Sequence, residues 1–469
     1  MIRDQQAGRD ERRDARSAVP SHLTQDAFFP RAAAAAMPTI VSGSGPRLLD
    51  DRGRTLIDVC SGPFLAALGQ GNERVLQAMH DQGRQLTYTY SRTTRTQANA
   101  SLVERLVDLA GHGFERAHLT SGGSEAIEMA LKMLRAHRVA TGRPERRAVI
   151  SLMPGYHGAT LQTLGLNGDL AAPALWGPMT VSSHKIPAPL TYRAPDAAHA
   201  ASASLAALAE TIERVGPEQV LAFVVEPIGG QSSGVNVPHP SFLRGVRELC
   251  DRHGIALVFD EIVTAMRTGR FLAAHDDPAA LPDVAVMAKG LAAGYAPLGA
   301  VLTTAALADE LADSTGFVVS HSYDANPIAC AAGTAVLDEV VEHDLIARGA
   351  LIGDRIRRGL ESMAAESPVI GDVRGRGALL AIELVADRAT AAMFGDGVDP
   401  GAVMIRHGLD NGLLLYSRRQ NGGRFGDWLL IAPPLVTDEA TADELVERLA
   451  ATLRAATPEL LTASSFRTT

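Results

Sequence analysis

The sequence has little of what marks disulfide scaffolds, nucleic-acid-binding proteins or membrane proteins. Its three cysteines, Cys60, Cys250 and Cys330, lie far apart and form no CxxC pair, which argues against a disulfide framework or a zinc ribbon and suits a reducing compartment. The net charge is −9 and no basic patch is interleaved with aromatic residues, so we expect no nucleic-acid partner. No stretch approaches about 18 consecutive apolar residues, and residues 1–20 lack the apolar core of a signal peptide. These absences predict a cytoplasmic protein without a membrane span.

Several motifs that bind metals or dinucleotides are also missing. There is no HExxH sequence and no cluster of cysteine and histidine, so we expect no protein-bound metal. Gly43-Ser44-Gly45 and Gly375-Arg376-Gly377 each lack the third glycine of a dinucleotide fingerprint. The segment GQSSG at 230–234 formally matches the G-x-S-x-G of serine hydrolases, but that motif needs a helix directly after its serine. The prolines of VNVPHP at 235–240 prevent such a helix from starting for several residues, which disfavours a serine hydrolase.

What the sequence does contain is a regular alternation of buried-strand and helix patterns. Strand-like runs at 146–152, 220–225, 255–259 and 284–288 are separated by segments with helical spacing, which predicts a mostly parallel sheet with helices on both faces. After Pro327 the pattern changes to that of a smaller α+β unit. We predict four parts, listed here: a loose N-terminal tail at 1–20, an N-terminal arm at 21–75 that contributes to the small domain, a large three-layer α/β/α domain at 76–329, and a small C-terminal domain at 330–469.

Two of the buried-strand runs end in charged residues. The run at 255–259 is followed by Asp260 and Glu261, and the run at 284–288 by Lys289. Carboxyl ends of parallel strands form the ligand-binding edge of open α/β sheets. A lysine there loses hydration, which lowers its pKa and makes its amine a nucleophile toward carbonyl groups. Taken alone, Lys289 could equally form a salt bridge or extend along the surface into solvent.

Further residues complete a set that would bind pyridoxal 5′-phosphate. Ser121-Gly122-Gly123-Ser124 joins a strand-like run to a helix, so its backbone N–H groups could hold a phosphate, although a plain glycine turn with a serine cap has the same pattern. Tyr156 follows a strand and offers an aromatic face. This cofactor needs a phosphate site, a lysine for its aldehyde, an acid for its ring nitrogen and an apolar or aromatic sandwich. Asp260 and Lys289 would supply the acid and the amine.

These residues lie within longer segments that together resemble the class III, or ω-type, aminotransferases, which are fold-type I pyridoxal-phosphate enzymes. The resemblance extends from about His22 to Leu453. The segments that carry it, in order, are LTSGGSEAIEMALKMLR, GYHGAT, VVEPIGG, FDEI, AKGLAAGYAPLGAVL, SYDANPIACAAGTAVL, GDVRGRGALLAIELVAD and IAPPLVTDE.

The resemblance implies a role for individual residues. Gly123 and Ser124 would hold the cofactor phosphate, Tyr156 would stack on one ring face, and Ile262 would pack on the other. Asp260 would meet the ring nitrogen and Lys289 would bond the cofactor covalently. Glu226 would lie in the cofactor's neighbourhood. Ser322, where the family usually has threonine, would reach the phosphate of the neighbouring subunit of a homodimer with shared active sites.

The substrate side departs from the family's usual pattern. The common DEVxTGxGRTG run is shortened to DEIVTAMRTG, a form that resembles glutamate-semialdehyde aminomutases. Gln231 stands where the γ-aminobutyrate branch has an acid that pairs with a switching arginine. For the arginine that binds a substrate carboxylate, the segment SRRQNGGRFGD offers Arg418, Arg419 and Arg424, of which we choose Arg424 because it precedes the last strand in a glycine-flanked loop.

The resemblance predicts an aminotransferase with ping-pong kinetics. An amine or amino-acid donor would load the cofactor, and a keto acid, aldehyde or ketone would take up the amino group. Phe64 and Tyr90 are candidate substrate-pocket residues by position alone. The alternative on the same fold is an aminomutase, racemase or decarboxylase that uses the same Lys289.

Overall fold

The computed structural model describes residues 37–111, 113–169, 172–314 and 320–465. The predicted tail at 1–20 and the first part of the predicted arm lie outside these residues.

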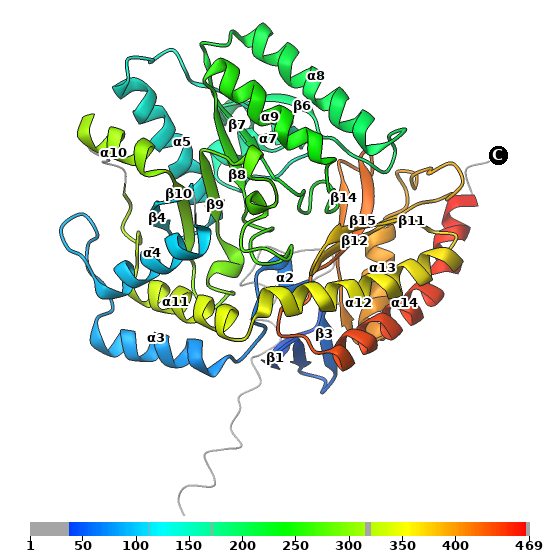
Figure 1. Ribbon diagram of the computed structural model, residues 1–469. Helices are drawn as coiled ribbons and strands as arrows, with labels where there is room; N and C mark the ends of the chain where they lie inside the picture. Colours follow the sequence, from blue (N-terminus) through cyan, green and yellow to red (C-terminus); the bar gives the residue numbers. More distant parts are fainter. Residues whose placement is uncertain (1–36, 112, 170–171, 315–319, 466–469) are drawn as a thin grey trace, which may run out of the picture.

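The helices and strands alternate along much of the chain (Figure 1). The strands are β1 Ile40–Ser44, β2 Arg47–Asp50, β3 Thr55–Asp58, β4 Arg116–Thr120, β5 Ala148–Met153, β6 His184–Pro187, β7 Val220–Val225, β8 Ala256–Asp260, β9 Val284–Met287, β10 Gly299–Thr303, β11 Ile370–Arg376, β12 Leu379–Leu384, β13 Leu413–Leu414, β14 Tyr416–Gln420 and β15 Gly426–Ile431. The α-helices are α2 Ser61–Phe64, α3 Glu73–Gln85, α4 Gln97–Ala110, α5 Gly123–Ala140, α6 Leu161–Leu166, α7 Ala172–Trp176, α8 Ala197–Val215, α9 Pro240–His253, α10 Ala305–Ser314, α11 Pro327–Glu342, α12 Leu345–Glu366, α13 Pro400–Asp410 and α14 Glu439–Ser465. Short 3-10 turns are η2 Gly177–Met179, η3 Ala273–Asp276, η4 Pro278–Ala280 and η5 Lys289–Leu291.

The centre of the molecule is a seven-stranded sheet in the order β4-β10-β9-β8-β7-β5-β6. The pairs among β9, β8, β7, β5 and β6 are parallel, whereas β10 runs antiparallel to both of its neighbours, β4 and β9. The predicted mostly parallel sheet is therefore confirmed. Since β4 opposes β10, it runs in the same direction as β9, so the carboxyl ends of all the parallel strands meet at one edge.

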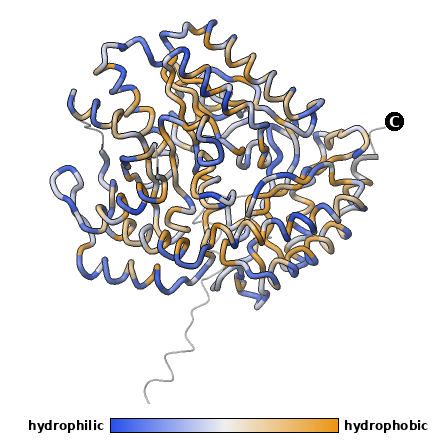
Figure 2. The backbone as a smooth tube through the Cα atoms, viewed as in Figure 1, coloured by the Kyte–Doolittle hydropathy of each residue, from blue (hydrophilic) through white to orange (hydrophobic). Residues whose placement is uncertain are grey.

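Both faces of this sheet are covered by helices, which is why its strands are apolar throughout rather than alternating. In β8, Leu257 and Phe259 face a core shared with α4, α8, α9 and α11, while Val258 faces a second core formed with α5. Figure 2 shows hydrophobic residues concentrated on the central strands and the inward sides of the helices, with hydrophilic residues on outer turns such as those of α3.

Two smaller sheets lie beside the central one. The sheet β1-β2-β3-β13 joins the N-terminal arm to residues 413–414, and the sheet β11-β12-β15-β14 packs against α12 and α13 (Figure 1). Residues 51–53 lie in the turn of a hairpin formed by β2 and β3. The predicted start of the small domain, residue 330, lies inside α11, whose buried side chains belong to the same core as the central sheet. We therefore propose that the boundary between the large and small domains lies after α11.

The sequence patterns differ from the structure in two places. The long helical pattern from Cys330 to Met363 is divided into α11 and α12 at Asp344, whose φ of +47° cannot continue a helix. The proline-rich sequence before α8, which gives no clear strand pattern, contains the short edge strand β6. Across the described residues, no helix has both the length and the apolar character needed to cross a membrane.

Candidate active site

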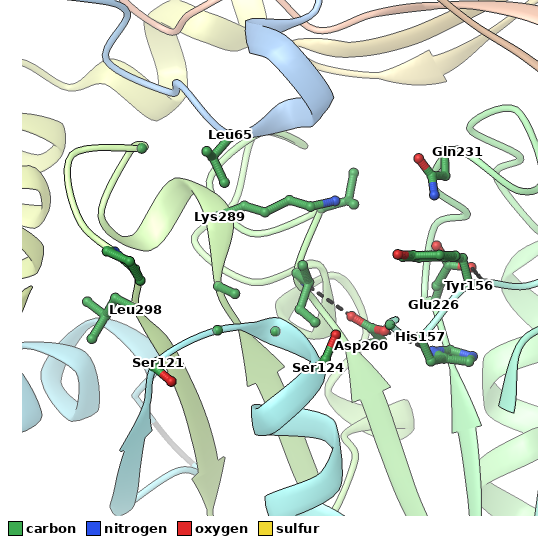
Figure 3. Close-up of a pocket in the computed structure, with 18 of the residues that line it drawn as sticks. Leu65, Ser121, Ser124, Tyr156, His157, Glu226, Gln231, Asp260, Lys289 and Leu298 are labelled. Atoms are coloured by element: carbon green, nitrogen blue, oxygen red, sulfur yellow. Dashed lines mark hydrogen bonds and ion pairs between the residues drawn. The ribbon is translucent and has the colours of Figure 1, made fainter. Parts of the chain in front are cut away.

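One pocket of about 410 Å³ lies at the carboxyl edge of the central sheet. Its lining comes from the segments that follow β4, β5, β7, β8 and β9, and from the residues that lead into β10. Figure 3 shows Ser124, Tyr156, Asp260 and Lys289 around the same opening. The predicted meeting of charged strand ends therefore occurs in the structure, because parallel strands deliver their following residues to one edge.

The start of α5 forms one wall of this pocket. Ser121, Gly122, Gly123 and Ser124 all line it, and the first N–H groups of a helix have no partner within the helix. A Cβ on Gly123 would lie 2.8 Å from Ile262 Cδ1, so glycine is needed for the close approach of the helix to the residue after β8. Ser124 Oγ accepts a hydrogen bond from the backbone N–H of Ala159 at 3.0 Å. This wall is suited to holding an anion such as a phosphate.

Asp260 is held in a fixed orientation at the floor of the pocket. It is the last residue of β8 and is buried, and its Oδ2 lies 2.8 Å from Nδ1 of the buried His157. Its Oδ1 accepts a hydrogen bond from the backbone N–H of Ile262 at 3.1 Å. Asn167 in turn holds the loop that carries the histidine. Its side-chain oxygen accepts from the N–H of His157 at 2.6 Å, and its side-chain nitrogen donates to the carbonyl of Gly158 at 2.8 Å. The carboxylate is thus pre-oriented by neighbours on separate segments.

Lys289 follows β9 and extends into the pocket (Figure 3). Its backbone has φ of +44°, an uncommon conformation for a residue with a side chain, and the buried surroundings hold it there. Burial lowers the pKa of the Lys289 amine, while the nearby carboxylates of Asp260 and Glu226 work in the opposite direction. The lowered pKa increases the fraction of neutral amine, the form that attacks carbonyl groups and accepts protons.

The side of the pocket opposite α5 is formed by the segment after β7. Burial raises the pKa of Glu226, whose carboxylate accepts hydrogen bonds from the N–H groups of Gly230 at 2.8 Å and Tyr156 at 3.3 Å. Gln231 lines the pocket and accepts a hydrogen bond from the hydroxyl of Tyr416. Glu226 therefore organises the loop that presents Tyr156 and Gln231, in addition to its charge near Lys289.

The sequence-predicted site residues divide into two groups. The pocket brings together those predicted to contact the cofactor within one chain: Gly123, Ser124, Tyr156, Glu226, Asp260, Ile262 and Lys289. Phe64 is buried just behind it, with Lys289 Nζ 5.2 Å from the centre of its ring. Tyr90 and Ser322 are exposed and do not line the pocket.

The three candidate arginines also lie in different places. Arg424, our choice from the sequence, does not line this pocket but a separate cavity beside β15. Arg419 forms an ion pair with the buried Asp427 at 2.7 Å. Arg418 lies on β14 two residues from Tyr416, and its charge opposes the burial that raises the pKa of Tyr156 and of Tyr416. Among the three, Arg418 is therefore the arginine whose charge reaches the pocket.

Sequence reasoning missed several residues that matter here. No role was predicted for His157, which contacts the Asp260 carboxylate, or for Asn167, which holds the backbone of His157. Arg267 is fully buried and donates to the carbonyls of Phe64, Ala432 and Pro433. It stands between Met266 and Thr268 in a segment that also contains Arg270, so nothing in the sequence distinguished it as buried. No group of metal-binding side chains was found among the described residues.

Comparison with known proteins places this pocket in a family. The model of the family "Aminotransferase class-III" matches residues 29–453. A probable aminotransferase from Mycobacterium tuberculosis is 32% identical, with 87% of this chain and 88% of that protein covered. The taurine–pyruvate aminotransferase of Bilophila wadsworthia is 29% identical, with 91% and 92% covered.

A solved structure agrees with these sequences. The ω-transaminase of Pseudomonas jessenii in complex with PMP is 27% identical and superposes with a TM-score of 0.87, covering 95% of this chain and 99% of that chain. The family model spans most of the chain, and the pocket contains the lysine, acid, aromatic residue and helix start that the family requires. The chain belongs to the class-III aminotransferase family and is a pyridoxal-phosphate-dependent aminotransferase.

Proposed function

We propose that the pocket at the carboxyl edge of the central sheet transfers an amino group from an amine or amino-acid donor to a keto acid, aldehyde or ketone. The observation that carries this proposal is the convergence of Lys289, Asp260 and the start of α5 on one opening. When bound, pyridoxal phosphate supplies an aldehyde that condenses with amines and a ring that takes up the electrons released when a neighbouring C–H bond breaks. The pocket fits this group, because Gly123 leaves a space that a Cβ would fill and Asp260 is an oriented buried acid.

The chain's own residues would divide the work as follows. Backbone N–H groups at Gly123 and Ser124 would hold the phosphate, while Tyr156 and Ile262 would confine the ring between them. Asp260 would hold a proton on the ring nitrogen, and His157 would keep the carboxylate aimed at it. Lys289 Nζ, with its lowered pKa, would take the proton from the donor's carbon and return it at the end of the transfer.

We propose Arg418, rather than Arg424, as the group that binds the carboxylate of a keto acid. Its support is the influence of its charge on Tyr156, which lines the pocket, and on Tyr416, which donates to the pocket residue Gln231. Arg418 Nη2 lies 3.9 Å from Asp169 Oδ2, and its Nε donates to Gln420 at 3.0 Å. The ion pair with Asp169 is long and Gln420 is uncharged, so both contacts are weaker than a bidentate bond to a carboxylate. The guanidinium can therefore turn toward a substrate carboxylate.

The active unit that we propose is a homodimer in the cytoplasm. Ser322 and Tyr323 are exposed, and Tyr88 and Tyr90 form a second exposed aromatic segment. Exposed apolar side chains that form a contiguous patch mark surfaces at which proteins associate. Ser322 would complete the phosphate site of the partner, which explains why it does not line its own pocket. Light scattering of the purified protein should give twice the chain mass, and an active monomer would contradict the shared site.

The decisive test of the chemistry uses the chain's low lysine count. Lys132, Lys185 and Lys289 are its only lysines. Burial lowers the pKa of Lys185 to about 7. Lys185 therefore controls for labelling that depends only on a lysine amine being neutral, and not on its place in the pocket. The purified protein should show a cofactor absorption band that borohydride abolishes, with the reduced adduct mapped to Lys289 alone. A colourless protein, or an adduct on Lys185, would overturn the assignment.

A mass balance of amino groups then separates transamination from the alternative reactions on this fold. An aminotransferase must consume one carbonyl acceptor for each donor that it deaminates, whereas an aminomutase, racemase or decarboxylase needs no second substrate. Sustained turnover of a donor without any acceptor would therefore refute amino transfer. Pyruvate and 2-oxoglutarate should both be offered as acceptors, with an aldehyde as the acceptor that lacks a carboxylate.

A further inference from the structure

A second cavity of about 220 Å³ lies between residues 190–193, the segment at 233–236 and the strands β11, β12 and β15. It shares no lining residue with the cofactor pocket. Its apolar wall is formed by Leu190, Phe425 and Trp428. Nothing in the amino-transfer reaction uses this cavity.

The cavity has more positive than negative groups. Arg193, Arg374 and Arg424 line it together with one carboxylate, Glu383. The buried Glu383 is already paired with Arg374, at 2.6 Å, and with Arg193. Within the described part of the chain, the guanidinium of Arg424 makes no hydrogen bond or ion pair. Its Cζ lies 6.0 Å from the centre of the Phe425 ring. One permanent positive charge at this cavity therefore lacks a counterion.

A buried hydroxyl at the same place also lacks a partner. Ser233 is 5% exposed and lies between this cavity and a smaller one beside Gly229, both of which it lines, and its Oγ makes no hydrogen bond. Buried polar atoms are normally paired, so such an atom calls for a bound group or water. The nearby side chain of Asn236 does not bond the Ser233 hydroxyl. Its oxygen accepts from the N–H of Thr191, and its nitrogen donates to the carbonyl of Pro189. Ser233 belongs to the GQSSG segment, whose Gly230 and Gln231 serve the cofactor pocket while Ser233 does not line it.

From the free guanidinium, the unpaired hydroxyl and the aromatic wall we infer that this cavity binds a small carboxylate with an aromatic or branched apolar body. Arg424 binds the carboxylate, Ser233 donates to it or to a water beside it, and Phe425 and Trp428 contact the apolar body. An arginine fork suits two carboxylate oxygens, and the aromatic side chains of the lining suit an apolar body.

The site has a direct structural connection to the cofactor pocket. Trp428 Nε1 donates to the backbone carbonyl of Gln231 at 2.7 Å, and the side chain of Gln231 lines the cofactor pocket. A ligand that moves Trp428 therefore moves Gln231. As a consequence that rests on the proposed function, occupancy changes the KM for the amine donor.

Binding can be measured through Trp428 itself. Trp176 and Trp428 are the only tryptophans, and Trp176 is exposed, so the Trp176→Phe holoenzyme emits from Trp428 alone. Benzoate is the probe, and benzamide, its neutral analogue, is the control. Benzoate should change the Trp428 emission with saturation, and Arg424→Gln should raise its Kd by about tenfold or more, the loss of about 1.4 kcal/mol of charge-assisted binding.

Two further variants separate this site from the cofactor pocket. Arg52→Gln removes an exposed arginine of the turn between β2 and β3 and should leave the Kd unchanged. Arg418→Gln should also leave it unchanged, because Arg418 serves the other pocket. Equal binding of benzamide, or loss of the signal in Arg418→Gln but not in Arg424→Gln, would overturn the inference. Because the signal is fluorescence and not turnover, a failure here is distinguishable from a failure of amino transfer.

Discussion

Replacing Asp260 with asparagine removes a charge from the pocket without changing its shape. The wild-type carboxylate accepts from the N–H of Ile262 at 3.1 Å and lies 2.8 Å from His157 Nδ1. An asparagine amide has one oxygen and one NH₂ group, so its NH₂ must face one of these two neighbours. If it faces Ile262, two donors meet. If it faces His157, the ring must accept at Nδ1 and carry its proton on Nε2, an atom that is buried without a partner.

The size of the effect follows from the loss of one charge-assisted interaction. A hydrogen bond to a charged group contributes about 1.5–3 kcal/mol, and each 1.36 kcal/mol changes a rate by about tenfold. Asp260→Asn should therefore lower kcat/KM by about 10- to 150-fold while the protein remains folded. The pKa of Lys289 should also fall further, because the Asp260 carboxylate raises it in the wild type.

Two measurements check this reasoning. Steady-state kinetics with matched donor and acceptor give kcat/KM, and labelling of the cofactor-free protein by an amine-reactive reagent across pH gives the titration of Lys289. His157→Gln should have a smaller effect of the same sign, since it removes only the support for Asp260. A variant at position 260 with wild-type kcat/KM and an unchanged Lys289 titration would refute the role that we give the carboxylate.

Three other positions carry shorter predictions. Gly123→Ala should weaken cofactor binding, measured by equilibrium dialysis, and Ile262→Val should restore part of it, because the new Cβ would lie 2.8 Å from the isoleucine's Cδ1; equal loss with and without the second change would argue against that contact. Burial lowers the pKa of Lys185 from 10.5 to about 7. Between these two pH values Lys185 is protonated in the unfolded chain and largely neutral in the folded one, so the unfolded chain binds more protons. Lys185 should therefore make stability rise with pH there, and in thermal melts Lys185→Met should remove that rise; an unchanged slope contradicts it. Arg267→Met should lower the unfolding free energy by about 2–3 kcal/mol in chemical denaturation, because three buried carbonyls lose their donor, whereas a change below about 0.5 kcal/mol, the size of an ordinary surface substitution, would show that they find other partners.

The order of strands and helices was readable from the sequence because its signals are local. Buried parallel strands are short, wholly apolar runs, and the charged residues that follow them, such as Asp260 and Lys289, stand out at their ends. The antiparallel direction of β10 and the edge position of β6 were not readable, because pairing direction depends on contacts between segments far apart in the chain. The same holds for the packing of α11 against the large-domain core.

The arginine of the substrate side shows where local signals fail. Arg418, Arg419 and Arg424 lie within seven residues of sequence, and position in a loop favoured Arg424. Alternation along β14 places Arg418 on the side of Tyr416 and turns Arg419 toward Asp427, and this is why we propose Arg418 instead. The register of β14 against β15 is set by pairing that no single segment encodes.

Arg267 makes the same point about charge. A buried arginine without a carboxylate in contact is costly, and burial lowers its pKa to about 10. Its guanidinium nevertheless joins the carbonyl of Phe64 in the arm to those of Ala432 and Pro433 after β15. The ring of Phe64 in turn lies against Lys289 Nζ. The Lys289 amine therefore lies beside a residue of the arm that Arg267 ties to the segment after β15, and the charge of Arg267 helps to keep the pKa of Lys289 low. A residue whose role depends on three distant segments cannot be recognised from its own neighbours in sequence.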